Sequence, residues 1–496
     1  MELKSSSARR FRPKALAFNI VVLSALILLE SYNIARPALW ADEIATISAA
    51  NRPVSTLIAL TGQIDGVHGT YYLFMHYWGG AFGITPFSLR LPSALAIALA
   101  AFLTWKLATK LFGSATGTTT LLLVALMPRL TWAATEGRSY AFTALIAVGI
   151  LWCFIAALEN TGAESKLYWF AFTALSILGV YLFIYLILLI VSLGAWLLVG
   201  RKSADIKTER PRLRMATSFF VVLILSLFQL IRANGQQHQI HWLPPISRRT
   251  IDEVLVGQSF WMTPGMAVLG FGLIVAIVFS TGKLSADEQR STRLLALLAA
   301  IPPILVVSYS LLKSTIYDAR YFTFTTPFVA MLLALAVAKL FTKRIAAGLV
   351  VVLLALATAS YLDFRSPEAK LTDWDRVAAS VSALSRENTG ILYGDYRDPT
   401  PTVSRIHLGY PSEFRGVTDI TLVKPARNRW KLFDERKPLL ETVAEWNRFK
   451  RILLISDGSH LEADQAATAA LTKSGFKATR ALQLKPESIV VFELVH

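Results

Sequence analysis

Long hydrophobic runs separated by short polar segments dominate the first 365 residues of the chain. A helix needs about 20 mostly apolar residues to cross a hydrocarbon layer of about 30 Å. The pattern therefore predicts a polytopic α-helical membrane protein. We expect about eleven transmembrane helices, near residues 14–33, 89–108, 115–134, 140–158, 167–181, 183–199, 215–231, 263–281, 294–312, 322–340 and 345–361.

One further apolar segment, YYLFMHYWGGAFGIT at residues 71–85, is shorter than these and rich in Tyr, Trp and Gly. Aromatic side chains are enriched at membrane–water interfaces. We therefore expect an interfacial helix near residues 70–84 and no crossing of the membrane there.

The basic start of the chain, followed by the first apolar run, has two interpretations. It resembles the charged and apolar regions of a signal peptide, but no small-x-small cleavage site follows and many more apolar runs do. An uncleaved first span is the favoured interpretation.

The pattern changes after Arg365. Strand-like runs occur at 391–396, 451–457 and 488–495, and helical stretches occur at 441–449 and 462–475. We therefore predict two domains, a membrane domain at 1–365 and a small α/β domain at 366–496.

Composition supports this division. Hydrophobic residues make up 54% of the chain and charged residues only 17%, so a fully soluble fold is disfavoured. The net charge of +17 is concentrated in the apolar part, with 31 Lys and Arg against 16 Asp and Glu up to Arg365. This excess indicates membrane orientation and no nucleic-acid partner. The single Cys153 excludes an intrachain disulfide and a cysteine-based metal site.

The distribution of basic residues also predicts the orientation. With a cytoplasmic N-terminus and eleven spans, 20 of the 31 basic residues of the membrane domain lie in inside loops. Counting 70–84 as a span would reverse everything downstream. The positive-inside rule therefore predicts eleven spans, with the N-terminus inside and the C-terminal domain on the extracytoplasmic side.

Acidic residues are rare in the membrane domain, and several lie on the predicted outer face. Asp42 and Glu43 follow the first span, where adjacent carboxylates suit general-base catalysis. The alternative is an ordinary helix N-terminus, where acidic residues are also common.

Other outer-face residues suggest binding of an anionic lipid headgroup. Asp65, His68, Tyr71 and Tyr72 precede or begin the predicted interfacial helix, which would otherwise be a plain aromatic belt. Two further loops place arginines on this face, where guanidinium groups bind phosphate in a bidentate manner. Their residues are Glu136, Arg138 and Tyr140 in one loop and Asp318, Arg320 and Tyr321 in the other. The alternatives are ion pairs within each loop and ordinary interfacial anchors.

A third loop contains two histidines, His238 and His241, together with Arg232, Arg248 and Arg249. Histidines three residues apart share a helical face and can bind a metal, but a lone pair is weak evidence. No cofactor is predicted, and a divalent cation stays an open alternative.

The order of these motifs resembles a known family. The motifs are WADE at 40–43, D-x-x-H-G-x-Y-Y at 65–72, RLPSALA at 90–96, EGRSYA at 136–141 and ARYF at 319–322. This order resembles the GT-C fold glycosyltransferases, in particular bacterial relatives of dolichyl-phosphate-mannose protein mannosyltransferases and of the lipid A aminoarabinose transferase. The resemblance covers roughly residues 10–330 and is strongest over 36–142.

The resemblance implies an activity. Members of the family transfer a sugar from a polyprenyl-phosphate donor to a hydroxyl acceptor on the outer side of the cytoplasmic membrane, so the resemblance implies this membrane for the present chain. By this resemblance Asp42 is the catalytic base beside Glu43, and the substrate-binding positions are His68, Arg90, Glu136, Arg138, Tyr140, Arg320 and Tyr321. Asp65, Tyr71, Tyr72 and His241 are further substrate-binding candidates. The chain departs from the family where Gly69 and Thr70 replace a proline pair and where Glu136 replaces an aspartate.

The predicted function is thus an integral membrane glycosyltransferase, with mannose as the favoured sugar and inversion at the anomeric carbon. The acceptor hydroxyl belongs to a protein, a glycolipid or an envelope glycan. A transporter or a flippase for lipid-linked sugars is the alternative, although it should show repeated halves and charges at the membrane midplane. A non-catalytic scaffold would leave the one-sided clustering of acids and arginines unexplained.

Overall fold

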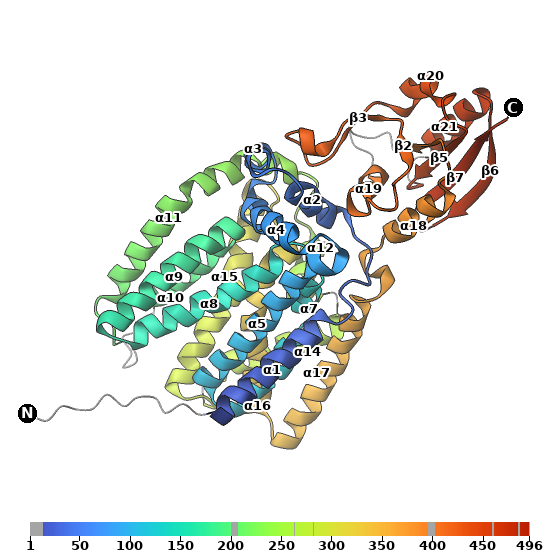
Figure 1. Cartoon of the computed structure of the whole chain (residues 1–496). Coiled ribbons are helices and arrows are strands. Elements are labelled where there is room, and N and C mark those ends of the chain that lie inside the picture. Colours follow the sequence, from blue (N-terminus) through green and yellow to red (C-terminus); the bar gives the residue numbers. More distant parts are fainter. Residues whose placement is uncertain are drawn as a thin grey trace, which may run out of the picture.

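A computed structural model describes residues 13–199, 207–261, 263–280, 282–394, 402–458, 461–484 and 487–495. In this part of the chain, eight helical segments are long and apolar enough to cross a membrane. They form a bundle of roughly aligned helices (Figure 1). The eight are α1 (Pro13–Ser31), α5 (Pro86–Phe112), α8 (Tyr140–Glu159), α9 (Gly162–Leu182), α11 (Pro211–Gly235), α15 (Ala286–Leu312), η4 (Ala319–Thr325) with α16 (Thr326–Leu340), and α17 (Lys343–Asp363).

Three of the eleven predicted spans have a different form. The segment predicted at 115–134 is split into α6 (Ser114–Val124) and α7 (Pro128–Ala134), because proline favours the first turn of a new helix over continuation of the old one. The span predicted at 183–199 is α10 (Leu186–Val199), with only 14 residues. The count of eleven stays a prediction.

The third is the predicted span at 263–281, which corresponds to α14 (Pro264–Phe279). It is bent by 87° from the helical segment Arg248–Phe260, and the two together would count as a ninth span. That preceding segment consists of α12 (Arg248–Asp252), η3 (Glu253–Gly257) and α13 (Gln258–Phe260).

Short helices lie at one end of the bundle, the end from which the C-terminal domain extends (Figure 1). They are α2 (Ala41–Ala50), α3 (Val54–Gln63), η1 (Gly66–His68) and α4 (Gly69–Phe82). Helix α4 coincides with the predicted interfacial helix and has 14 residues, too few to cross a membrane. A second short segment, η2 (Gln237–Ile240), follows α11.

Helix α16 lies at the centre of the bundle. Every residue from Thr326 to Val337 is buried, which matches its uniformly apolar sequence. Helices α1 and α17 lie at the rim, where many of their large apolar side chains are exposed. Such exposure is expected of helices that face lipid.

The C-terminal domain contains a mixed five-stranded sheet, in the order β2-β1-β5-β7-β6. Strands β2, β1 and β5 are parallel, whereas β7 and β6 are antiparallel to their neighbours. The strands are β1 (Thr389–Tyr393), β2 (Val417–Asp419), β5 (Arg451–Ser456), β6 (Phe476–Gln483) and β7 (Ser488–Leu494), with β3 (Leu422–Lys424) and β4 (Glu435–Arg436) in a small second sheet. The helices are α18 (Trp374–Leu384), α19 (Ile406–Gly409), α20 (Val443–Trp446) and α21 (Leu461–Lys473).

The sheet confirms the predicted α/β character of this region. All three predicted strand runs contain a strand, and the central β5 is buried along its whole length, as a central strand covered on both faces should be. Residues 395 and 396 of the first predicted run lie outside the described residues. The strand β6 was not predicted because most of its residues are exposed and half of them are polar, so no apolar pattern marks it.

Candidate active site

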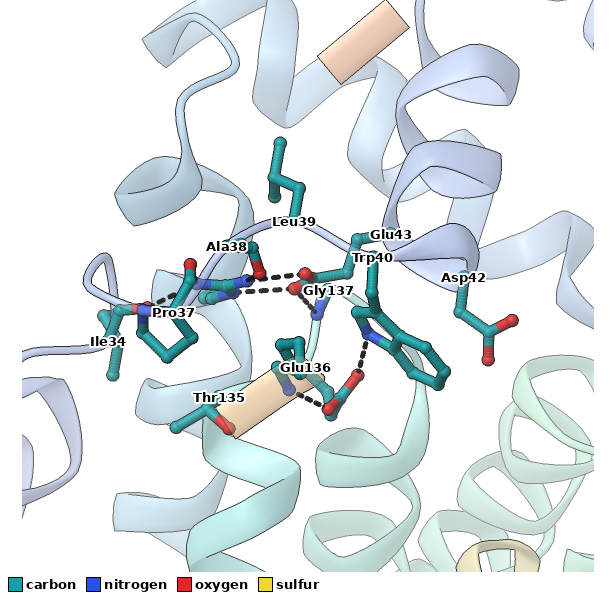
Figure 2. Close-up of polar contacts among 12 residues, drawn as sticks. Ile34, Pro37, Ala38, Leu39, Trp40, Asp42, Glu43, Thr135, Glu136 and Gly137 are labelled. Atoms are coloured by element: carbon teal, nitrogen blue, oxygen red, sulfur yellow. Dashed lines mark hydrogen bonds and ion pairs between the residues drawn. The ribbon is translucent and has the colours of Figure 1, made fainter. Parts of the chain in front are cut away.

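Helix α2 begins at Ala41 after an extended segment, and its first turn contains Asp42 and Glu43. Two carboxylates in the first turn are favourable because they face the positive end of the helix dipole. Successive residues on a helix point about 100° apart. The two side chains accordingly point to different sides of α2, as Figure 2 shows.

The Glu43 side chain is fully buried against Arg90 of α5. Arg90 Nε lies 2.7 Å from Glu43 Oε1 and Arg90 Nη2 lies 2.6 Å from Oε2. The remaining guanidinium hydrogens are donated to backbone carbonyls of the segment before α2 (Figure 2), namely Ile34, Pro37 and Ala38, at 2.8–2.9 Å. All five donors of Arg90 are therefore used inside the protein.

The Glu43 carboxylate also accepts the backbone N–H of Gly137 at 3.0 Å. Glu43 and Arg90 thus join α2, α5 and the loop before α8, and neither lines the cavity described below. Their contacts favour a structural role for both over the catalytic and substrate-binding roles that the resemblance implies.

The Asp42 carboxylate, in contrast, forms ion pairs with two arginines from distant parts of the sequence. Arg320 Nη1 lies 2.9 Å from Oδ2, and Arg138 Nη2 lies 3.4 Å from Oδ1. Burial raises the pKa of the Asp42 carboxyl, but the charges of Arg138 and Arg320 outweigh this effect, so its pKa is lowered overall. Asp42 is therefore ionised at neutral pH.

These three side chains line a cavity of about 520 Å³. Its polar lining includes Asp42, Asp65, His68, Arg138 and Arg320, together with the aromatic rings of Tyr140 and Tyr321. Another part of the wall is apolar and comes from α10, α11, α15 and the turn before α10, through Ile184, Ile187, Leu188, Leu230, Leu305 and Val306. The cavity is thus amphipathic, and its apolar wall is built by helices of the bundle. We call it the headgroup cavity.

A chain of polar contacts extends from Asp42 to Asp65. Arg138 Nη1 donates to the Tyr72 hydroxyl at 2.6 Å, and that hydroxyl donates to Asp65 Oδ2 at 2.7 Å. Asp65 has a left-handed backbone, with φ of 54°, which is uncommon outside glycine, asparagine and aspartate. Burial raises the pKa of the Asp65 carboxyl, and Arg138 and Tyr72 offset only part of this increase.

His68 contributes a nearly buried imidazole to the cavity. Its ring stacks on Phe183, with centroids 5.9 Å apart, and Nδ1 has no hydrogen-bond partner within the described residues. Burial lowers the pKa of His68 well below its usual value, and the charge of Arg138 lowers it further. His68 is therefore neutral at neutral pH and can offer a hydrogen bond to a ligand.

The remaining candidates lie away from the headgroup cavity. Glu136 is buried and accepts the indole N–H of Trp40 at 3.0 Å, while its other oxygen pairs with Lys370. Tyr71 packs edge-on against Phe142 and does not line the cavity. His241 is exposed and does not line it either. Among the described residues, no group of three or more His, Cys, Asp or Glu is arranged to hold a metal ion.

Several residues of the site were not singled out from the sequence. Gln237 and Trp242 line the cavity from the segment after α11, and Lys370 reaches Glu136 from the start of the C-terminal region. The amide-rich run ANGQQHQ at 233–239 is the only sequence signal for the first of these. Nothing in the sequence singles out Lys370, because its partner lies 234 positions earlier in the chain.

Comparisons with known proteins agree with this architecture. A family model described as dolichyl-phosphate-mannose-protein mannosyltransferase matches residues 80–228. A search of curated proteins found no significant match.

Two solved structures are similar over nearly their whole length. The crystal structure of ArnT from Cupriavidus metallidurans in the apo state has a TM-score of 0.59 at 13% identity, covering 96% of this chain and 98% of that chain. The structure of the same protein bound to undecaprenyl phosphate has a TM-score of 0.56 at 13% identity, with the same coverage. The chain therefore has the fold of ArnT, a GT-C fold, as the motif order had implied.

Proposed function

We propose that the protein is a membrane glycosyltransferase that transfers a sugar from a polyprenyl-phosphate donor to a hydroxyl acceptor. The observation that carries this proposal is the ionised Asp42, paired with Arg138 and Arg320, in the lining of a cavity that has both charged and apolar walls. A prenylated sugar phosphate has the same division, with an anionic headgroup and a hydrocarbon tail. The family model at 80–228 and the complex of ArnT with undecaprenyl phosphate support the same donor class.

In this proposal the two arginines bind the donor phosphate. Guanidinium groups form short, charge-assisted hydrogen bonds with phosphate oxygens, and Arg138 Nε is buried without a hydrogen-bond partner within the described residues. The neutral His68 adds a hydrogen bond through Nδ1. The apolar wall formed by α10, α11 and α15 accommodates the first part of the prenyl chain.

Asp42 acts as the general base for the acceptor hydroxyl. The leaving group is a prenyl phosphate, which is already anionic and needs positive charge more than a proton, whereas the hydroxyl needs a proton acceptor. In the free protein the arginines hold the pKa of Asp42 low and make it a weak base. A bound phosphate would share their charge, raise the pKa of Asp42 and so activate it.

A single displacement at the anomeric carbon gives inversion of configuration. Mannose is the favoured sugar because of the family model, and the acceptor is a hydroxyl of a protein, a glycolipid or an envelope glycan. In this proposal the reaction takes place on the extracytoplasmic face of the cytoplasmic membrane, and the distribution of basic residues supports that orientation.

The test is sugar transfer by the purified protein supplemented with a membrane extract. We expect transfer from polyprenyl-phosphate-mannose and none from nucleotide sugars. Transfer from nucleotide sugars alone would contradict the proposal. Movement of the lipid-linked sugar across liposomes without any transfer would instead support the flippase alternative.

A further inference from the structure

We propose that Lys370 is a positioning residue of the active site, through which the start of the C-terminal region fixes the loop that carries Arg138 and the helix that carries Asp42. This inference rests on the proposed function for its activity readout. Its structural basis is a set of contacts around the start of α2.

The loop at residues 136–138 is attached to the start of α2 by each of its residues. Glu136 accepts the N–H of the Trp40 indole, and the Gly137 carbonyl accepts the Thr46 hydroxyl at 2.8 Å. Arg138 then pairs with Asp42. The position of the loop and the position of the Asp42 carboxylate are therefore coupled.

Lys370 supplies the counter-charge for this loop. It ends the short helix η5 (Pro367–Lys370), its side chain is only 5% exposed, and it pairs with the fully buried Glu136. The next residue, Leu371, has a left-handed backbone with φ of 53°. A buried lysine beside a strained residue indicates that the local fold holds the ammonium group in this position.

The same C-terminal region holds the extended segment before α2. The Thr372 hydroxyl donates to the Leu39 carbonyl at 3.3 Å, and the Leu39 N–H donates to the Tyr410 hydroxyl at 2.9 Å. Lys370 Nζ also lies 5.8 Å from the Trp40 ring, on which Arg320 packs at the same distance. Contacts from the C-terminal region therefore converge on the residues that orient Asp42 and Arg320.

The charges around Glu136 make the role of Lys370 testable. Glu136 faces Lys370 from η5, Glu43 from α2 and Arg90 from α5, and the guanidinium of Arg90 is already paired with Glu43. Burial raises the pKa of Glu136, and Lys370 is the main group that opposes this increase. Without Lys370 the ionised Glu136 would be a buried anion with no cation of its own.

The experiment compares Lys370→Met with the double variant Glu136→Gln/Lys370→Met. In the single variant we expect transfer to fall about 10- to 100-fold near pH 8, since small displacements of reacting groups have effects of this size. The loss should shrink toward about pH 5.5, because protonation of Glu136 removes its unpaired charge. The double variant should regain transfer to within about threefold of wild type at both pH values, because the carbonyl oxygen of the substituted amide can still accept the Trp40 N–H.

A matched control comes from the same domain. Lys437 and Glu445 form an ion pair on the surface, with both side chains about one-third exposed. Lys437→Met and Lys437→Met/Glu445→Gln make the same chemical changes at this surface pair. We expect both variants to transfer sugar at the wild-type rate, because surface ion pairs contribute little.

Two measurements decide the outcome, namely sugar transfer by the variants and undecaprenyl-phosphate binding by the wild-type protein. Unchanged transfer in Lys370→Met, or a double variant as impaired as the single one, would overturn the inference. If Lys370→Met does not fold, transfer is compared between the charge-balanced double variant and Lys370→Arg instead. Absence of both undecaprenyl-phosphate binding and transfer in the wild-type protein would instead overturn the proposed function, which separates the two failures.

Discussion

Arg320 Nη1 lies 2.9 Å from Asp42 Oδ2, although the two residues are 278 positions apart in the sequence. Arg320 also lies 3.0 Å from Asp318, so it connects α2 to the start of the central helical segment η4–α16. The contact brings the Asp42 carboxylate and the guanidinium that we propose binds phosphate to the same point. The predictions below depend on this arrangement.

The first prediction concerns Asp42→Asn. Loss of a general base typically reduces the rate by about 10² to 10⁴, and we expect a reduction of this size in kcat. The substitution also removes the carboxylate that competes for Arg138 and Arg320, so binding of undecaprenyl phosphate should be retained or become tighter. Kinetics and a binding titration on the same preparation measure both effects. Retained turnover would exclude Asp42 as the base, and Glu368→Gln at an exposed ion pair is the control.

The second prediction concerns Arg320→Gln. A hydrogen bond to a charged group contributes about 1.5–3 kcal/mol, so we expect KM for the donor to rise about 10- to 100-fold. Arg249→Gln is the matched control, because the Arg249 side chain is 79% exposed and pairs with Glu253 of the next turn. A donor affinity that does not respond to Arg320→Gln would contradict a phosphate role for this arginine.

The two adjacent carboxylates of α2 should differ in their effect on stability. Glu43→Gln breaks a fully buried bidentate ion pair with Arg90. Removal of one partner leaves the other charged and unpaired, which typically lowers the free energy of unfolding by about 3–5 kcal/mol. We expect a large decrease in Tm for Glu43→Gln and a much smaller one for Asp42→Asn. Thermal unfolding followed by intrinsic fluorescence measures this difference. Equal decreases would show that the two carboxylates have similar structural roles.

The membrane part of the fold could be predicted because its signal is local. Apolar runs of sufficient length identified the eight segments that are long enough to cross a membrane, and the aromatic, glycine-rich run at 70–84 identified α4. The break at Pro128 between α6 and α7 was missed, because one proline changes the mean hydropathy of a long apolar run very little. Strand β6 was missed for the opposite reason, because its mostly exposed residues have no apolar pattern.

The site was less accessible to prediction because its members meet only through the tertiary fold. Motifs nominated Asp42, Arg138 and Arg320, which do line one cavity. The same motifs nominated Arg90 and Glu136, whose contacts are all inside the protein. A sequence motif records that a residue type is required, but it does not distinguish a group that contacts substrate from one that supports its neighbour.

The orientation of the molecule can be tested by labelling. Helix α5 has 27 residues, so its end near Ser114 lies about 40 Å from its start beside α4. With Cys153 replaced by Ala, we expect a membrane-impermeant maleimide to label Leu371→Cys on intact cells, since Leu371 is 85% exposed. Ser114→Cys should be labelled only after permeabilisation. The reverse pattern would place Asp42 and the C-terminal domain in the cytoplasm.

The last prediction follows from the buried His68. Its pKa lies well below the usual 6.5, so the folded protein does not bind the proton that the unfolded chain binds below about pH 6.5. His68 therefore lowers the free energy of unfolding as the pH falls below that value, by up to about 1.4 kcal/mol per pH unit. We expect His68→Gln to lose less stability than wild type between about pH 7 and 5. His241→Gln, the same substitution at an exposed histidine, is the matched control. Thermal unfolding across this pH range is the measurement, and parallel curves for His68→Gln and wild type would show that the pKa of His68 is not lowered in the folded protein.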